Sequence, residues 1–307
     1  MEKQYDILVA GEINPDLVLS CPDLEPRFDQ HETLVDSADL TIGSSCAIFA
    51  CGVARLGLRV AIIGIVGKDL FGDFMLAEMQ QRGVDISHVI VDPGCETGLS
   101  VILSRIHDRA ILTHTGSIDA LHAWQVKDDL LIKSRHLHVA SYFLQTALQP
   151  GLPELFRRAH SFGLTTSLDT NWDPAEQWTG VQSLLRLTDI FLPNAAEAQA
   201  IADLPDTGAA ALSLAQHAII VAVKQGAQGA LAARDKQLIH SSPIPAKVID
   251  TVGAGDSFDA GFLYAYLNHW SMEKALKLAT ACGAISTQSA GGTTGQATLD
   301  EALHYVD

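Results

Sequence analysis

The residues best suited to chemistry lie in one short segment, Asp250-Thr-Val-Gly-Ala-Gly-Asp256. Gly253 and Gly255, with only Ala254 between them, leave backbone N–H groups uncovered by side chains. A helix-like run begins directly afterwards, so its free N–H groups and the positive end of its dipole face the same point. Such a point binds an anion. Asp256 among these donors predicts a base that takes a proton from a hydroxyl as the hydroxyl attacks phosphorus, and hence phosphoryl transfer to an alcohol.

Two further pairs of polar residues follow apolar runs that are typical of buried strands. Asn14 and Asp16 come after the first run, where paired hydrogen bonds could hold sugar hydroxyls. Asp169 and Asn171 come after a later run. In parallel sheets ligands bind beyond the carboxyl ends of the strands, so these pairs are candidates for substrate binding. For the first pair alone, an Asn-Pro-Asp turn without a ligand is the alternative.

A metal site and a nucleotide site are predicted further along the chain. Asn194 and Glu197 are three residues apart and share one face of a helix, and oxygen ligands, partly through water, suit Mg²⁺. A plain helix start with Glu197 near the dipole is the alternative. Lys224 could offset phosphate charge, and Gly226 and Gly229 let the backbone approach a nucleotide.

The elements that must position these residues alternate between strands and helices, which favours a mostly parallel sheet covered on both faces. The run at 16–42 breaks this pattern, and we expect two exposed strands there, one of them including Thr33–Val35. A hairpin is expected at 99–113. These segments predict a small separate sheet. The strands expected in the main sheet are Ile7–Gly11, Val60–Gly64, Leu137–Ala140, Thr165–Leu168, Asp189–Leu192 and Ala218–Val223.

The segment from Asp250 to Asp256, with Phe258 and Gly261-Phe262, resembles the C-terminal signature of the ribokinase-like (PfkB) carbohydrate kinases. The resemblance extends from Tyr5 to Gly295. It implies a single ribokinase-like α/β domain over residues 1–307, with a β-sheet lid built from insertions at about 16–42 and 95–115. It also implies that Asp256 is the catalytic base and that the amides of Gly253, Ala254 and Gly255 form the anion hole.

The resemblance implies roles for other residues too. Asp16 would contact the sugar, with Asn14 beside it, and Asp169 and Asn171 would lie near the transferred phosphate. Asn194 and Glu197 would bind Mg²⁺, and Lys224, Gly226 and Gly229 would bind ATP. Asp250 could help to hold a monovalent cation such as K⁺, with a loop at 286–295. A homodimer through the lid is expected.

The segment from Gly43 to Gly57 resembles the N-terminal signature of the same family but departs from it. Ser44 replaces the second glycine, and Ile48 replaces an asparagine that could bind the sugar. Gly43 and Ser44 remain candidates for sugar binding. Asp173 stands where an arginine is usual, which removes a clamp for a phosphorylated sugar. We therefore expect altered selectivity and an unphosphorylated substrate.

Composition excludes several other classes of function. The 307 residues are 48% apolar and 18% charged, as in a globular protein with a large core. The formal charge of −16 disfavours nucleic acid and anionic membranes as partners. The five cysteines form no C-x-x-C pair, so no disulfide framework or zinc site is predicted. Without a signal-peptide core at the start or a bilayer-spanning run, a cytoplasmic protein is expected.

Together these features predict an ATP-dependent kinase that phosphorylates a primary hydroxyl of a ribose- or fructose-like sugar. A nucleoside kinase is an alternative and would need an aromatic wall for the base, for which Phe49, Phe28 and Trp124 are candidates. A non-catalytic sensor of sugars or nucleotides on the same fold is a second alternative.

Overall fold

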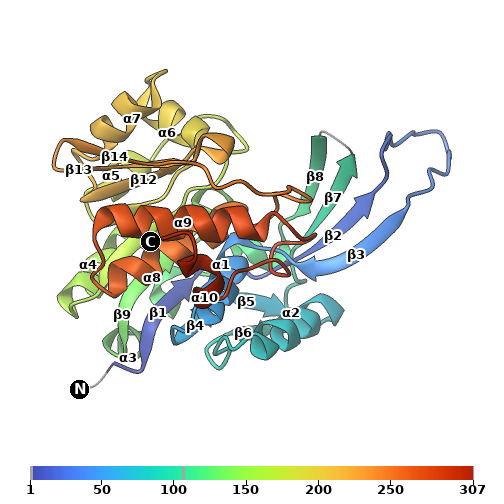
Figure 1. Ribbon diagram of the computed structural model, residues 1–307. Coiled ribbons are helices and arrows are strands. Elements are labelled where there is room, and N and C mark those ends of the chain that lie inside the picture. The colour runs from blue at the N-terminus through green and yellow to red at the C-terminus, as the bar shows by residue number, and fades with distance from the viewer. Residues whose placement is uncertain (1–2, 106–107, 307) are drawn as a thin grey trace.

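The computed structural model describes residues 3–105 and 108–306, and its centre is an eight-stranded sheet (Figure 1). Six neighbouring strands run parallel, and the last two are added antiparallel at one edge. In spatial order the strands are β14 (Gln237–Ser241), β13 (Ala230–Arg234), β12 (Ile220–Lys224), β11 (Ile190–Phe191), β10 (Thr165–Leu168), β9 (Ser134–Val139), β1 (Tyr5–Ala10) and β4 (Val60–Ile63).

Strand β1 shows why the sheet needs cover on both sides. All six of its residues are buried. Ile7 and Val9 belong to one apolar cluster and Leu8 and Ala10 to the other, as expected for side chains that alternate between faces. Helices must therefore pack on both faces, and the predicted mostly parallel sheet with helices on both sides is confirmed.

The helices divide between these two faces. One face packs against α1 (Ser45–Arg55), α8 (Ala254–Leu267), α9 (Met272–Ser286) and α10 (Leu299–Leu303), with α2 (Leu70–Gln81) nearby. The other packs against α3 (Asp128–Ile132), α4 (Leu152–Ser161), α5 (Val181–Leu185), α6 (Ala195–Ala202) and α7 (Thr207–Leu214). Helices α8 and α9 lie side by side across the front of the sheet in Figure 1.

A second sheet projects from the main body, at the right of Figure 1. Its order is β3 (Ser37–Ile42), β2 (Pro15–Ser20), β7 (Leu99–Arg105) and β8 (Asp108–His114). Residues 106 and 107, within the predicted hairpin, lie outside the described residues. A third, two-stranded sheet pairs β5 (Ile65–Gly67) with β6 (Ile90–Asp92).

The strand expected around Thr33–Val35 is wrong. That segment is a loop in which Leu34 is 81% exposed, and the second strand of the projecting sheet begins only at Ser37. Strand pairing explains why the strand begins later than predicted. β2 pairs antiparallel with residues 37–42, so that Ser20 lies opposite Ser37 and Pro15 lies opposite Ile42. Local composition alone did not reveal which residues β2 would pair with. That the projecting sheet acts as a lid stays a prediction.

Among residues 3–105 and 108–306, no helix is long and apolar enough to cross a membrane. All five cysteines are unpaired, as their scattered positions predicted.

Asp6, at the amino end of β1, offers a test of how the sheet is held together. Its carboxylate accepts hydrogen bonds from Arg59 Nε at 3.1 Å and Arg135 Nη1 at 3.1 Å. Burial alone would raise the pKa of Asp6, but the hydrogen bonds from the two arginines outweigh it and the pKa falls below its usual value. Asp6→Ala should lower the free energy of unfolding at pH 7 by about 2 kcal/mol.

Because the folded-state pKa of Asp6 is depressed, its contribution is present above the unfolded-state pKa of about 4 and is lost as the pH falls. Urea unfolding at pH 7 and pH 3 should therefore show a smaller difference between wild type and variant at the lower pH. An equal difference at both pH values would contradict the ion pairing.

Candidate active site

The polar residues singled out in the sequence meet at the carboxyl edge of the main sheet, because most of them lie at or after the end of a parallel strand. The residues after β1, β10, β11 and β12 lie on this edge, and the start of α8 lies beside it. Its residues are Asn14, Asp16, Asp169, Asn171, Asn194, Lys224 and Asp256.

Helix α8 begins at a turn that only glycine fits. Gly253 has φ of +70°, and a Cβ there would lie 2.6 Å from the carbonyl oxygen of Gly292 and 2.9 Å from a methyl of Ile48. Ala254 and Gly255 open the helix, and their amides are among those that have no partner within it. The structure thus places a helix start with free amides, which is suited to bind an anion, at this edge.

Asp256 lies in the first turn of α8 and is 8% exposed. Burial, followed by the charge of Asp169, raises its pKa to about 8, while Lys224 and a hydrogen bond from Ser45 act in the opposite direction. A buried carboxylate with a pKa near neutrality is suited to accept a proton from an alcohol. Asp256 is therefore equipped to be a general base.

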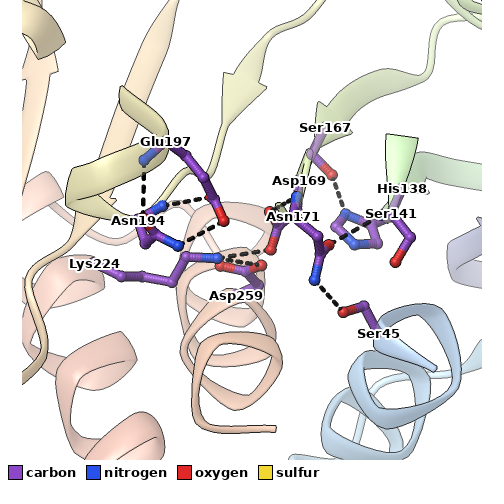
Figure 2. Close-up of polar contacts among 10 residues, drawn as sticks. All are labelled: Ser45, His138, Ser141, Ser167, Asp169, Asn171, Asn194, Glu197, Lys224 and Asp259. Atoms are coloured by element: carbon purple, nitrogen blue, oxygen red, sulfur yellow. Dashed lines mark hydrogen bonds and ion pairs between the residues drawn. The ribbon is translucent and has the colours of Figure 1, made fainter. Parts of the chain in front are cut away.

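A buried ion cluster adjoins this helix start (Figure 2). Lys224 Nζ donates to Asp169 Oδ2 at 2.7 Å and to Asp259 Oδ2 at 3.2 Å. Burial raises the pKa of Asp169, but the charge of Lys224 outweighs it and the pKa falls below its usual value; burial raises the pKa of Asp259 well above its usual range. Carboxylate oxygens of Asp169, Asp256 and Asp259 all lie within 4.8 Å of one another.

Sequence reasoning missed Asp259. The available signal was its spacing, three residues after Asp256 and hence on the same helical face. Its contact with Lys224, 35 residues earlier, arises only when α8 packs against the end of β12.

A cavity of about 610 Å³ opens beside the cluster. Its more buried end is lined by Lys224, Ala254 and Gly255, and its more exposed part by Thr251 and by apolar residues such as Pro243 and Val248. Gly226 and Gly229, in the turn between β12 and β13, line it too. Both have positive φ, and a Cβ on Gly229 would strike the backbone of Ser241 to Pro243. An apolar slot that ends at a helix start and a lysine suits a nucleotide.

Asn194 and Glu197 form a capping box at the start of α6. Asn194 Oδ1 accepts from Glu197 N at 3.0 Å, and Glu197 Oε2 accepts from Asn194 N at 2.9 Å. Figure 2 shows Asn194 and Glu197 close to the Lys224 side chain. Burial, then the charge of Asp169, raises the pKa of Glu197 to about 7. The capping alternative is therefore realised, and the carboxylate sits where a cation would stabilise its charged form.

Asp16 and Gly43 lie in contact on the side of the projecting sheet. The Asp16 carboxylate occupies the space where a Cβ on Gly43 would lie. Burial raises the pKa of Asp16 to about 7, whereas the charge of Arg109 lowers it. Asn14 is buried beside them and donates to Pro15 O at 3.3 Å. These groups form the polar candidate site for a sugar.

The two serines at the start of α1 have different surroundings. Ser44 has φ of +67°; its hydroxyl donates to Glu12 O at 2.6 Å and accepts from Ala47 N, so it caps the helix. Ser45 Oγ accepts from Asn171 Nδ2 at 2.7 Å (Figure 2) and also reaches Asp256. Ser45 therefore contacts Asp256, whereas the hydroxyl of Ser44 is used to cap the helix.

Asp250 connects two loops next to the Gly253 turn. Its carboxylate accepts from Val252 N at 3.0 Å and from Gly291 N at 2.9 Å. The loop at 286–295 therefore does lie beside Asp250, although its role in holding a cation stays a prediction.

The departures from the family pattern have structural explanations. Ile48 is 3% exposed and packs against Gly253 and Gly292. Asp173 accepts from the backbone N–H groups of Ala175, Gln177 and Trp178 and so holds its own loop. Neither side chain substitutes for the polar group that the family pattern has there.

The three aromatic residues considered for a nucleobase wall do not form one. Phe49 is fully buried and stacks on His138 with ring centroids 3.8 Å apart. Phe28 is 91% exposed in the loop between β2 and β3, and Trp124 is 65% exposed and stacks on His122. This leaves the nucleoside alternative without its expected support.

Comparison with known proteins identifies the class that this fold and site define. The model of the pfkB family of carbohydrate kinases matches residues 5–299, so the chain belongs to that family. An uncharacterized sugar kinase of Archaeoglobus fulgidus is 31% identical over 80% of this chain and 97% of its own. A 5-dehydro-2-deoxygluconokinase of Geobacillus thermodenitrificans is 26% identical over 99% of this chain and 94% of its own.

A solved structure agrees in both fold and size. An E. coli protein described as a ribokinase II, in complex with ATP and Mg²⁺, superposes with a TM-score of 0.87 at 25% identity, covering 100% of this chain and 99% of that one. The protein has the ribokinase-like fold and is a carbohydrate kinase.

Proposed function

We propose that this kinase transfers the γ-phosphate of ATP to a primary hydroxyl of an unphosphorylated, ribose- or fructose-like sugar, with Asp256 as the base. One observation carries the proposal. Asp256 directly follows Gly255, which lines the cavity, and it hydrogen-bonds with Ser45; the charge of Glu12 acts on both Asp256 and Asp16. We therefore propose that a sugar hydroxyl and the end of a triphosphate meet at Asp256.

Asp256 would accept the hydroxyl proton as the oxygen attacks phosphorus in line. The amides of Gly253, Ala254 and Gly255 would stabilise charge on the transferred group. ATP would occupy the apolar cavity along Lys224, Gly226 and Gly229.

Mg²⁺ would be held by Asn194 and Glu197, largely through water, where it would neutralise phosphate charge. The proposal also includes a monovalent cation, such as K⁺, near Asp250. A homodimer would form through the projecting sheet, on which Leu40, Ile111 and Leu112 are exposed. The sugar would be bound by Asn14, Asp16, Gly43, Ser44, Asp169 and Asn171.

A substrate panel tests the proposal directly. ADP release should be measured with ribose, fructose, 5-dehydro-2-deoxygluconate and adenosine, each with Mg·ATP. Turnover of a free sugar is the expected result. Turnover of adenosine alone would establish the nucleoside alternative, and binding without turnover of any of them would favour the sensor.

The pKa of Asp256 predicts a pH profile. The base must be ionised to accept a proton, so kcat/KM for the sugar should rise about tenfold per pH unit up to about pH 8 and level off above it. The measurement is initial rates at low sugar concentration from pH 6.5 to 9.5. A flat profile over this range would contradict the assignment of the base.

Glu197→Gln tests the metal site. Glutamine still offers an oxygen to the Asn194 N–H but loses the charge that would attract Mg²⁺, so the Mg²⁺ concentration for half-maximal rate should rise about tenfold. Glu301→Gln is the matched control, because Glu301 closes the same capping box with Thr298 at α10. An equal effect of the two substitutions would exclude a metal role for Glu197.

A further inference from the structure

Lys224 forms ion pairs with Asp169 and Asp259 beside the nucleotide cavity, where its ammonium could bind a phosphate oxygen. Its side chain is 13% exposed, and those of Asp169 and Asp259 are 3% and 1% exposed. The ammonium has three N–H donors, of which the two carboxylates use two. Its nitrogen lies 3.5 Å from the point where a Cβ on Gly255 would be, and Lys224 lines the nucleotide cavity.

We propose that Asp259 is a positioning residue for phosphoryl transfer: together with Asp169 it fixes the Lys224 ammonium beside Gly255, at the inner end of the nucleotide cavity. The third N–H of Lys224 then donates a hydrogen bond to a phosphate oxygen on which negative charge develops. This inference rests on the proposed function. It gives a role to Asp259, which lies outside the motifs that suggested that function.

The geometry explains why two holders are needed. A lysine side chain has many rotamers, and a single ion pair leaves the ammonium free to move around one carboxylate. Asp169 follows β10 and Asp259 lies on α8, so the two contacts tie Lys224 to both the sheet and the helix that carries Asp256 (Figure 2). Positioning of a charge within a fraction of an ångström is what transfer of a phosphoryl group requires.

The surroundings of Asp259 favour its neutral form. It is buried with Oδ1 lacking a hydrogen-bond partner among the described residues, and burial favours the protonated acid. A neutral Asp259 adds no negative charge around Lys224, whose ammonium already faces the charges of Asp169 and Glu197, so less negative charge is present to repel phosphate. An asparagine should therefore replace Asp259 better than an alanine.

The first test compares Asp259→Ala and Asp259→Asn. Asp259→Ala should lower kcat by about 10- to 100-fold, with the sugar KM changed less than about threefold. Asp259→Asn should recover most of that loss. Asp6→Ala is the control for loss of stability. It removes a buried carboxylate at the amino end of β1, away from the active-site edge of the sheet, and should leave kcat of the folded enzyme unchanged. Normal kcat in folded Asp259→Ala would overturn the proposal.

A double-mutant cycle tests whether Asp259 acts through Lys224. Adding Asp259→Ala to Lys224→Met should cause little further loss of kcat, because the group that Asp259 positions is already gone. Losses that multiply would show an independent, structural role and would reject the inference.

A binding experiment separates this inference from the proposed function. If the wild type phosphorylates none of the sugars, the proposed function fails, but titration calorimetry with Mg²⁺ and AMP-PNP or ADP still decides the role of Asp259. Asp259→Ala should weaken the triphosphate analogue about tenfold more than ADP. Equal weakening of both nucleotides would overturn the inference.

Discussion

Asp256→Asn should lower kcat by about 10³-fold while the protein stays folded and still binds Mg·ATP. The amide has nearly the same shape as the carboxylate but cannot accept the hydroxyl proton. The sugar oxygen would then have to attack phosphorus without a base. The measurement is steady-state ADP release at saturating sugar, with ATP affinity determined by titration calorimetry.

Stability separates loss of the base from loss of the fold. Burial raises the pKa of Asp256 to about 8, so the folded protein binds the Asp256 proton more tightly than the unfolded chain does. The unfolded chain releases this proton near pH 4 while the folded protein still holds it, so the free energy of unfolding falls as the pH rises from about 4 to about 8. The asparagine variant cannot ionise and should be at least as stable as the wild type at pH 8. Asp206→Asn is the matched control, since Asp206 caps α7 on the exposed surface and asparagine caps equally well. Near-normal kcat in Asp256→Asn would refute the assignment.

The fold and much of the site could be predicted because the signals were local. Thr165–Leu168 was predicted with the bounds that the structure has, and the residues that follow such strands had to meet at one edge once the strands were parallel. The turn at Gly253 was visible as two glycines before a helix. These inferences needed only strand direction and the backbone freedom of glycine.

Features that depend on contacts between distant segments could not be predicted in the same way. The strand Ser37–Ile42 is defined by its pairing with β2, and the segment before it looked equally suitable. Asp173 was noticed as a missing arginine, but its own role, accepting three backbone N–H groups, depends on how its loop folds back. Asp259 needed α8 to reach Lys224. In each case the partner is set by tertiary packing rather than by neighbouring residues.

Gly253→Ala should lower kcat by at least about 100-fold in protein that still folds. A Cβ would lie 2.6 Å from the carbonyl oxygen of Gly292, and backbone cannot move aside as a flexible side chain would. The turn must shift, and the amides that we propose to face the transferred phosphate shift with it, which should remove stabilisation of the kind that oxyanion-hole donors provide. Initial rates of ADP release, with the melting temperature recorded for each variant, give the measurement.

Gly163→Ala separates this effect from backbone strain alone. Gly163 also has a left-handed φ, +77°, but a Cβ there would meet nothing within 4 Å, and the residue lies between α4 and β10, away from the carboxyl edge of the sheet. The left-handed conformation costs an L-residue about 1 to 2 kcal/mol in either variant, so both should lose some stability. Only the change at Gly253 should also lower kcat. If Gly253→Ala lost more stability than Gly163→Ala but kept normal turnover, the Gly253 turn could not be the anion hole, because the turn would have shifted without consequence for the transferred phosphate.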